Sequence, residues 1–428
     1  MGSLSRFISQ YAAKPPHLRL HTPGHKGALL SSDITEVDGA DNLLSPSGVI
    51  LESERAAARL FGAGATLFSA CGSTPCVYAM LSAFKKAGGK RIAAGRYSHR
   101  SLITAAALLD LEIDWLYPTE FMSAKLGAAK IPRHSQAVFV TTVDYFGGRF
   151  DPRQLRTDLP ILADNAHGAH LVFTNTHPIK QGARFCCDGV HKTMPALTGA
   201  AYLHLKNPAD YTRLKSHYAL FASTSPSYAV LDSLDKCGDF ISRGKGKAEE
   251  AFAAIARLRQ HIENLGIDCF YDDPLHLTLN TKRFGYTGFS FAEAMRNEGA
   301  ECEYTDFDRV VLLFSVTTTA EDTAPILEII RTIPRKLPLD EEDFPLLRPK
   351  VAMSPHAALY SDTRYLETAN AIGGICGGIT APCPPGVPLV MPGEMFGKEE
   401  VEVLKRLGVE KVSVVKGWKS TSAPDQLG

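Results

Sequence analysis

The sequence lacks the features that mark membrane, secreted and nucleic-acid-binding proteins. None of its apolar runs approaches the ~18 residues that a membrane span needs. Lys and Arg together number 46, as do Asp and Glu, so no excess of one charge favours nucleic acid or an anionic membrane surface. The N-terminus shows no signal-peptide pattern, and Arg6 spoils a myristoylation motif. We therefore expect a cytoplasmic protein with no nucleic-acid or membrane partner.

Paired cysteines are also missing. The nine cysteines are odd in number and scattered, and none belongs to a Cys-x-x-Cys pair. This usage is typical of reduced, mostly buried thiols rather than of disulfides or a zinc site, so we expect no metal. The 428 residues exceed what one small core needs. We expect a large domain over residues 1–243 and a smaller α+β domain over residues 244–428.

What the sequence does contain is an alternation of short apolar runs with helical patterns. The first residues, up to the turn-rich segment 21–27, look like a linker. Beyond them the patterns predict strands and helices in turn. The predicted strands are 65–70, 91–95, 113–117, 137–143, 160–163, 185–187 and 200–205, and the predicted helices are 53–60, 76–87 and 101–111. Such an order favours an α/β fold with a mostly parallel sheet covered on both faces, in which ligands bind beyond the carboxyl ends of the strands. In the C-terminal part we expect a connecting helix over 244–265, then strand, helix, strand and helix.

A potential anion site follows the first predicted strand. There the sequence reads Cys-Gly-Ser-Thr-Pro over residues 71–75 and continues into a helical pattern. Ser73 or Thr74 can cap that helix, and Pro75 suits its first turn. Free N–H groups and the positive end of the helix dipole would then attract a phosphate. The alternative is a plain helix cap, which this segment alone does not exclude.

Two further strand ends carry polar side chains. His99 follows the strand 91–95, where its ring could stack on a flat ligand, although a single loop histidine is usually inert. Asp164 follows the strand 160–163, at the edge of the sheet, where a half-buried carboxylate needs a cationic or hydrogen-bonding partner. Taken alone, such an aspartate is more often a turn or capping residue.

Lys192 lies between two apolar runs, 185–187 and 200–205, in a segment punctuated by Pro, Thr and Gly. We expect it at the crest of a strand-loop-strand. A lysine held partly out of water there has a lowered pKa and a free lone pair for carbonyl chemistry. Most lysines in a chain of this length are simple surface residues. Lys192 stands out only through its neighbours.

Together these strand ends offer an amine, an anion site, a flat ring and a carboxylate along one edge of the sheet. Pyridoxal 5'-phosphate (PLP) needs these four groups, for its aldehyde, its phosphate, its ring face and its pyridine nitrogen. We therefore predict that the protein binds PLP.

The motifs resemble those of the Orn/Lys/Arg decarboxylase family, in the short bacterial form without an amino-terminal receiver-like domain. The matching segments are His21-Thr-Pro-Gly-His-Lys-Gly27, Gly72-Ser-Thr74, Ser98-His-Arg-Ser101, Tyr145-Phe-Gly147, Asp164-Asn-Ala-His-Gly-Ala-His170, His191-Lys-Thr193, Pro195-Ala-Leu-Thr198, Ser225-Pro-Ser-Tyr228, Ser233-Leu-Asp235, Pro384-Pro-Gly-Val-Pro388 and Pro392-Gly-Glu394. The resemblance implies the fold-type-I architecture of aspartate aminotransferase. It also implies decarboxylation of lysine, arginine or ornithine, polyamine biosynthesis, and a homodimer or larger homo-oligomer with a shared site.

The resemblance assigns a role to each matching residue. Lys192 would bind the cofactor aldehyde covalently, Asp164 would pair with the pyridinium nitrogen, and His99 would stack on the ring. Ser73 and Thr74 would hold the phosphate with His191 beside it, Ala166 would pack under the ring, and His167 would lie near the substrate or the ring hydroxyl. Glu394 would shape the substrate pocket across the dimer interface, where a carboxylate could neutralise the distal cation of a basic amino acid.

Four positions depart from the family pattern, and they keep other functions open. Gly189 replaces the serine of Ser-x-His-Lys, Asn165 stands for Glu, Cys383 for Tyr, and His356 for Arg. A weakly active or non-catalytic paralogue is therefore one alternative. Another is a fold-type-I aminotransferase or lyase. An aminotransferase would grip the α-carboxylate with an arginine, for which the candidates are Arg283, Arg309 and Arg364.

Overall fold

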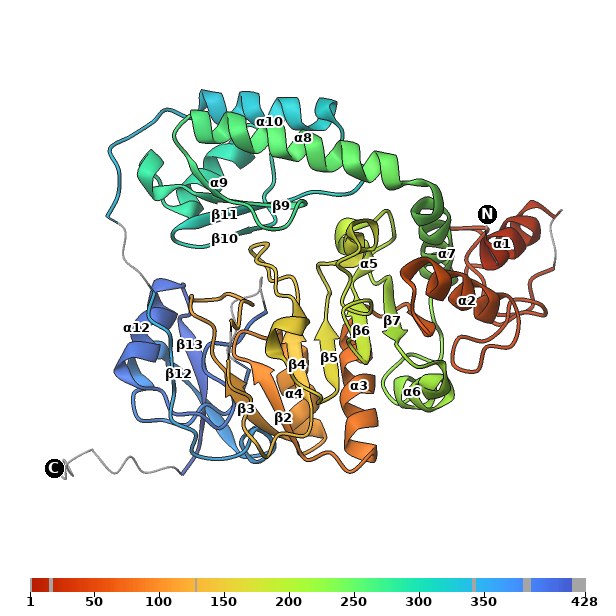
Figure 1. The fold of residues 1–428 in the computed structure, drawn as a ribbon, viewed down its shortest axis with the longest axis horizontal. Helices are drawn as coiled ribbons and strands as arrows, with labels where there is room; N and C mark the ends of the chain where they lie inside the picture. Colours follow the sequence, from red (N-terminus) through yellow and green to blue (C-terminus); the bar gives the residue numbers. More distant parts are fainter. Residues whose placement is uncertain (1, 15–17, 128, 341–343, 380–385, 418–428) are drawn as a thin grey trace.

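Three β-sheets organise the protein. The computed structural model describes residues 2–14, 18–127, 129–340, 344–379 and 386–417. Within these residues, the central sheet has seven strands, a second sheet has four, and a third has two. In Figure 1 the seven-stranded sheet occupies the middle of the molecule, the four-stranded sheet lies above it, and the two-stranded sheet lies beside β3.

The seven-stranded sheet is the scaffold of the large α/β part. Its strand order is β1-β7-β6-β5-β4-β2-β3. The strands are β1 (Ala65–Ser69), β2 (Arg91–Gly95), β3 (Glu112–Leu116), β4 (Val138–Thr141), β5 (Ile161–Asp164), β6 (Phe185–Asp188) and β7 (Ala201–Leu205). Strands β2 to β6 pair in parallel, and every residue of β5, β6 and β7 is buried. Burial on both faces explains why these strands read as continuous apolar runs rather than alternating ones.

The direction of the outer strands decides where functional side chains can meet. β7 is antiparallel to both β6 and β1. β1 therefore runs in the same direction as β2, β4, β5 and β6. The carboxyl ends of these five strands lie at one edge of the sheet, and the segments that follow them share that edge. The predicted anion site at residues 71–75, which follows β1, therefore lies at the same edge as the other strand ends.

Helices cover the sheet on both faces. Those of the large part are α1 (Ser3–Ala13), α2 (Val49–Phe61), α3 (Thr74–Lys86), α4 (Arg100–Leu108), α5 (Val190–Thr193), α6 (Tyr211–Ala219) and α7 (Tyr228–Arg243). Helix α2 ends at Gly62, whose left-handed backbone (φ 66°) accepts the helix terminus. The linker-like reading of the first residues was wrong, because α1 forms and buries Leu4 and Ile8 against its neighbours. Its packing on α2 and α7 is a tertiary effect that local composition does not show.

The second sheet and its helices form a layer above the large sheet (Figure 1). Its strands are β8 (Asp268–Phe270), β9 (His276–Asn280), β10 (Tyr304–Thr305) and β11 (Arg309–Leu313), and its helices are α8 (Lys245–Asn264), α9 (Gly288–Asn297) and α10 (Ala320–Thr332). Each strand pair in this sheet is antiparallel. The predicted domain boundary falls between α7 and α8, and it stays a prediction.

The C-terminal part, residues 344–379 and 386–417, packs beside the large sheet (Figure 1). It contains α11 (Pro355–Leu359), the antiparallel pair β12 (Thr363–Glu367) and β13 (Lys411–Val415), and α12 (Lys398–Arg406). Five short 3-10 helices complete the described structure: Pro152–Leu155, Ala169–Thr174, Pro208–Asp210, Lys282–Phe284 and Thr368–Asn370. Among the residues described, no helix combines the length and apolar character that crossing a membrane requires.

Candidate active site

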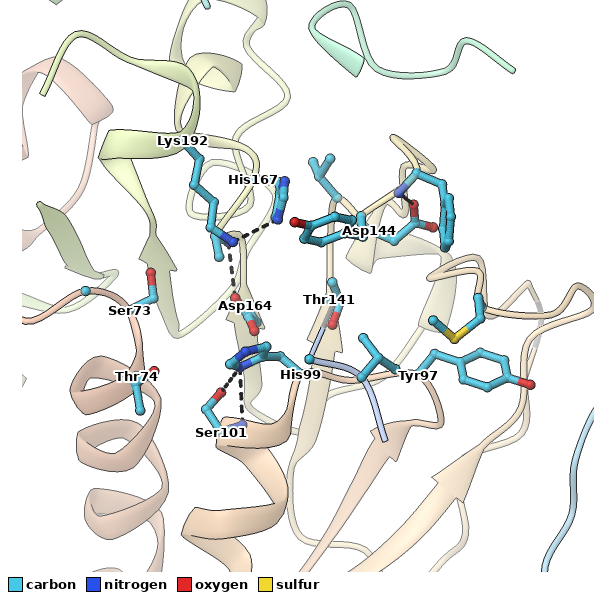
Figure 2. A pocket seen from close by; sticks show the side chains of 18 of the residues that line it. Ser73, Thr74, Tyr97, His99, Ser101, Thr141, Asp144, Asp164, His167 and Lys192 are labelled. Carbon is cyan, nitrogen blue, oxygen red and sulfur yellow. Dashed lines mark hydrogen bonds between the residues drawn. The ribbon is translucent and has the colours of Figure 1, made fainter. Parts of the chain in front are cut away.

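A cavity of about 340 Å³ opens at the carboxyl ends of the large sheet's strands. This volume lies in the range of small-molecule sites. Figure 2 shows side chains from several separate loops converging on it. The lining residues are Gly72, Ser73, Thr74, Tyr97, His99, Ser101, Met122, Thr141, Val143, Asp144, Tyr145, Phe146, Asp164, Ala166, His167, His191, Lys192, Gly386 and Val387. All of the predicted site residues except Glu394 are therefore brought together.

Ser73 stands at the beginning of α3, and its hydroxyl is not used as a helix cap. The Oγ atom is buried and has no hydrogen-bond partner among the described residues. Burying a hydroxyl without a partner costs free energy, so such an atom indicates that something else binds there. The free N–H groups of the first turn of α3 lie at the same point. These features fit an anion such as a phosphate, and they argue against the plain-cap alternative.

Asp164 closes β5 and is buried. Its Oδ1 atom accepts hydrogen bonds from the Ala166 N–H at 3.1 Å and from the Cys187 thiol at 3.8 Å. Its Oδ2 atom accepts none from any residue that the structure describes. A buried carboxylate with one free oxygen suits a cationic N–H group of a ligand.

His99 is the N-cap of α4, and its ring is held on one side. Its Nδ1 atom lies 2.9 Å from the Ser101 Oγ and accepts from the Ser101 N–H at 3.2 Å. Burial lowers the pKa of His99, and the charge of Asp164 opposes that shift. A neutral ring in a fixed orientation is suited to stack on a flat ligand. The neighbouring His191 contacts the Ala200 carbonyl oxygen through Nδ1 at 3.0 Å.

Lys192 lies in the one-turn helix α5 between β6 and β7, rather than in the irregular loop that the sequence predicted. Its Nζ atom lies 2.8 Å from His167 Nε2, as Figure 2 shows. Burial lowers the pKa of Lys192 below its usual value, whereas the charges of Asp164 and Glu303 raise it. The amine is thus closer to the neutral form that attacks a carbonyl carbon.

Glu394 is the one predicted site residue that does not line the cavity. Its side chain is buried, and it forms a two-pronged ion pair with Arg96 at 2.7 and 2.8 Å. Its Oε2 atom also accepts from the Met391 N–H. Both oxygens are already occupied, so the structure favours a role within the fold over the predicted contact with a substrate cation.

Three of the four departures from the family pattern lie in described residues. A Cβ atom on Gly189 would lie 2.7 Å from the Ala166 carbonyl oxygen, so this backbone has no room for a serine. Asn165 is fully buried and bonds Thr142 and Asp188 rather than facing the cavity. His356 contacts the Ala107 carbonyl oxygen, and it too does not line the cavity. Cys383 lies outside the described residues.

Sequence reasoning assigned no role to Thr141, the last residue of β4, or to Tyr145 in the loop after it. Thr141 and Tyr145 line the cavity, and the Tyr145 ring lies edge-on to His167 with ring centroids 4.9 Å apart. The Thr141 hydroxyl is buried without a partner among the described residues. The expected strand 137–143 ran past Thr141, so its true end was not inspected. The rule that ligands gather at strand ends would have found Thr141, whereas Tyr145 stands in the family segment Tyr145-Phe-Gly147.

The three arginines considered for an aminotransferase are absent from the cavity's described lining. Arg283 pairs with Asp268, and Arg309 pairs with Asp306 while its guanidinium lies over the Phe146 ring. Arg364 lies on β12, in the C-terminal part. No arginine lines the cavity among the residues described, so the structure offers no support for the aminotransferase alternative.

Comparison with known proteins gives the family. Residues 10–271 match the family described as "Orn/Lys/Arg decarboxylase, major domain", and residues 340–412 match "Orn/Lys/Arg decarboxylase, C-terminal domain". The chain belongs to the Orn/Lys/Arg decarboxylase family. The first match alone covers more than half of the chain, so the resemblance predicted from the motifs is confirmed.

Individual relatives of this family match over nearly their full length. The chain is 27% identical to the Bacillus subtilis protein YaaO, with 94% of each chain covered. It is 26% identical to an arginine decarboxylase of the same organism, with 93% of this chain and 91% of the relative covered. The crystal structure of the Francisella novicida lysine decarboxylase LdcF superposes with a TM-score of 0.81 at 16% identity, covering 97% of this chain and 81% of that one. The predicted fold class is thus confirmed: a fold-type-I large domain with a mostly parallel sheet, followed by a C-terminal domain.

Proposed function

We propose that this family member is a PLP-dependent decarboxylase that converts a basic amino acid into the corresponding amine. One observation carries the proposal: Lys192 faces the same buried cavity as Asp164, His99 and Ser73, and each of these offers the atom that the cofactor requires. The free Oδ2 of Asp164 and the unpartnered hydroxyls of Ser73 and Thr141 are the strongest signs that the cavity accepts a polar ligand.

The position of each residue in the cavity suggests its role toward the cofactor. Lys192 would hold the cofactor through its amine, Ser73, Thr74 and His191 would bind the phosphate, and Asp164 would keep the ring nitrogen protonated. When bound, PLP supplies an electron sink for the pair released as the Cα–carboxylate bond breaks. His99 and Ala166 would confine the ring from its two faces. After carbon dioxide leaves, Lys192 or His167 would return a proton to Cα.

Support for a basic substrate comes from the family and from charge near the cavity. The relatives whose names state an activity include arginine and lysine decarboxylases. Glu303 lies close enough to Lys192 to raise its pKa, and its Oε1 accepts a hydrogen bond from the Tyr145 hydroxyl at 2.5 Å. A carboxylate beside the cavity suits a substrate with a distal cation.

Carbon dioxide release from lysine, arginine and ornithine, measured beside keto-acid formation, tests this function. We expect carbon dioxide and the amine from at least one substrate, and no keto acid. Lys192→Ala should lose the yellow colour of the bound cofactor and nearly all activity, whereas exposed Lys206→Ala should keep both. Keto acid without carbon dioxide would favour transamination. A colourless wild-type protein that does not bind added PLP would favour the non-catalytic paralogue.

Three finer features belong to the same proposal. We propose a homodimer as the smallest assembly, a cytoplasmic location and a place in polyamine biosynthesis. Their support is the family resemblance and the chemistry of the product, since decarboxylation of lysine, arginine or ornithine yields a polyamine or its precursor. Light scattering coupled to size-exclusion chromatography tests the assembly, and cell fractionation tests the location.

A further inference from the structure

A continuous row of buried side chains leads from Lys192 to an aspartate that no motif singled out. Lys192 Nζ lies 2.8 Å from His167 Nε2, and His167 Nδ1 lies 3.0 Å from His276 Nε2. His276 Nδ1 in turn lies 2.8 Å from Asp273 Oδ1. His167, His276 and Asp273 are all at most 5% exposed. His276 begins β9, so this row connects the catalytic edge of the large sheet to the second sheet.

The acceptor at the far end decides where the protons lie. Asp273 can only accept when ionised, so His276 must carry its proton on Nδ1. A neutral His276 then has a bare Nε2, which accepts the proton carried by His167 on Nδ1. That in turn leaves Nε2 of His167 bare and facing the Lys192 amine. Every donor in the row therefore points away from Lys192 and toward Asp273.

The surroundings of Asp273 keep its charge in place. Its Oδ1 also accepts from the Leu275 N–H at 3.0 Å, and its Oδ2 lies 2.8 Å from His170 Nε2. The Nδ1 of His170 is buried and has no partner among the described residues. A bare nitrogen tolerates this better than a buried N–H would, so His170 carries a proton on Nε2 and donates it to Asp273.

The backbone is shaped to let this row form. Gly147 has a left-handed conformation (φ 83°), and a Cβ atom there would lie 2.4 Å from the His276 Cβ. No side chain other than hydrogen allows the loop after β4 to approach His276 so closely. The loop in turn places Tyr145 against His167, which fixes the plane of the imidazole.

We propose that Asp273 and His276 are positioning residues that hold His167 as the proton acceptor for Lys192. This inference rests on the proposed function. In the step, an N–H bond of the Lys192 ammonium breaks, its electron pair stays on Nζ, and a new N–H bond forms at His167 Nε2. The negative charge of Asp273, which hydrogen bonds of His276 connect to His167, stabilises the resulting imidazolium. The reverse transfer returns the proton after carbon dioxide leaves.

The electrostatics around His167 agree with this arrangement. Burial holds the pKa of His167 well below its usual value, and the positive charge of Lys192 lowers it further. The negative charge of Asp273 raises it. Removing that charge should therefore make His167 a weaker acceptor.

The test compares Asp273→Asn and His276→Asn with a matched control, His170→Gln. The control is equally buried and keeps a donor to Asp273, but it does not lie between Asp273 and Lys192. In the cofactor-free protein, the reaction of Lys192 with fluorodinitrobenzene, followed by peptide mass spectrometry across pH, reports the pKa of Lys192. In the loaded enzyme, kcat and KM are measured over the same pH range.

We expect the midpoint of Lys192 labelling to fall by about one pH unit in the two test variants, because the ammonium then faces a weaker acceptor in His167. The kcat should fall about 10-fold or more at nearly constant KM, and the acid limb of the Asp273→Asn profile should move to lower pH. The kcat of His170→Gln should match that of the wild type within about twofold. If Asp273→Asn does not fold, His276→Asn carries the comparison.

Unchanged labelling in both test variants, or equal shifts in His170→Gln, would overturn the inference. The labelling needs no substrate, so its result is separate from the proposed function. A labelling shift without carbon dioxide release from any basic amino acid would support the row of hydrogen bonds and refute the decarboxylase. Carbon dioxide release with unmoved labelling would do the opposite.

Discussion

Replacing Glu394 by alanine removes one half of a fully buried ion pair. Arg96 is 0% exposed, and its two terminal nitrogens donate to the two oxygens of Glu394 at 2.7 and 2.8 Å. The same guanidinium donates to the Leu389 carbonyl and lies 5.0 Å from the Trp115 ring centroid. The substitution leaves this cation without its counter-charge in a site that excludes water. Breaking such a pair costs about 3–5 kcal/mol of the free energy of unfolding.

Removing the second charge as well should restore most of the lost free energy of unfolding. Because a buried ion pair is often no more stable than apolar residues of similar size, Arg96→Met combined with Glu394→Leu should recover most of the loss. Exposed Glu399→Ala is the control, and it should change the free energy by less than about 0.5 kcal/mol. Both cost and recovery follow from the pair's burial.

Urea unfolding, followed by circular dichroism and by the fluorescence of Trp115 beside Arg96, measures these differences. A loss below about 1 kcal/mol in Glu394→Ala would refute the reasoning, because exposed pairs contribute no more than that. If the same variant instead raised KM for a basic amino acid without loss of stability, Glu394 would serve the substrate, as the family resemblance implied.

Other predictions concern the cavity and its core. Ser73→Ala should raise the dissociation constant for PLP by about 10- to 150-fold, because it removes a hydrogen bond to a charged group. Titration of the cofactor-free protein with PLP measures this constant. An unchanged constant would mean that the phosphate binds elsewhere. Gly189→Ser should lower the free energy of unfolding by about 1–3 kcal/mol, because the serine Cβ would lie 2.7 Å from the Ala166 carbonyl oxygen. Denaturant titration measures the difference, and a variant more stable than the wild type would contradict the prediction. Burial lowers the pKa values of His167 and His204, so the unfolded chain, which titrates near pH 6.5, binds more protons than the folded one. The free energy of unfolding should therefore fall as the pH drops below about 6.5, by up to about 1.4 kcal/mol per pH unit for each histidine. Equal stability in denaturant titrations at about pH 7.5 and 5.5 would contradict the lowered pKa values of these two histidines.

A buried cluster in the core shows why residue types alone do not define a metal site. His177, Asp188 and His204 place their ligand atoms within 4.8 Å of one another. Each histidine donates from Nε2 to Asp188, while its Nδ1 has another partner, the Ile179 N–H or the Thr66 hydroxyl. Hydrogen bonds thus satisfy the cluster, and they explain how Asp188 stays ionised in the core.

The sequence by itself determined the α/β alternation and most of the cavity's polar residues. Buried strands of 4 to 5 residues and glycine-ended helices are local patterns, and parallel strands bring their carboxyl ends to one edge. These two facts suffice to place Ser73, His99, Asp164 and Lys192 near one another. Element ends were predicted less well, and the extra residues expected for β4 hid Thr141.

Only the tertiary structure decided the partners that come from distant parts of the chain. Asp273 and His276 reach His167 because the second sheet packs over the edge of the first, and no local pattern encodes that approach. Glu394 pairs with Arg96 across 298 positions of the sequence, a contact that no motif indicated. Local patterns reflect the periodicity of one segment, whereas contacts between segments depend on how whole layers pack. The motifs therefore indicate which residues line the cavity, and the packing of the two sheets determines which buried residues stand behind them.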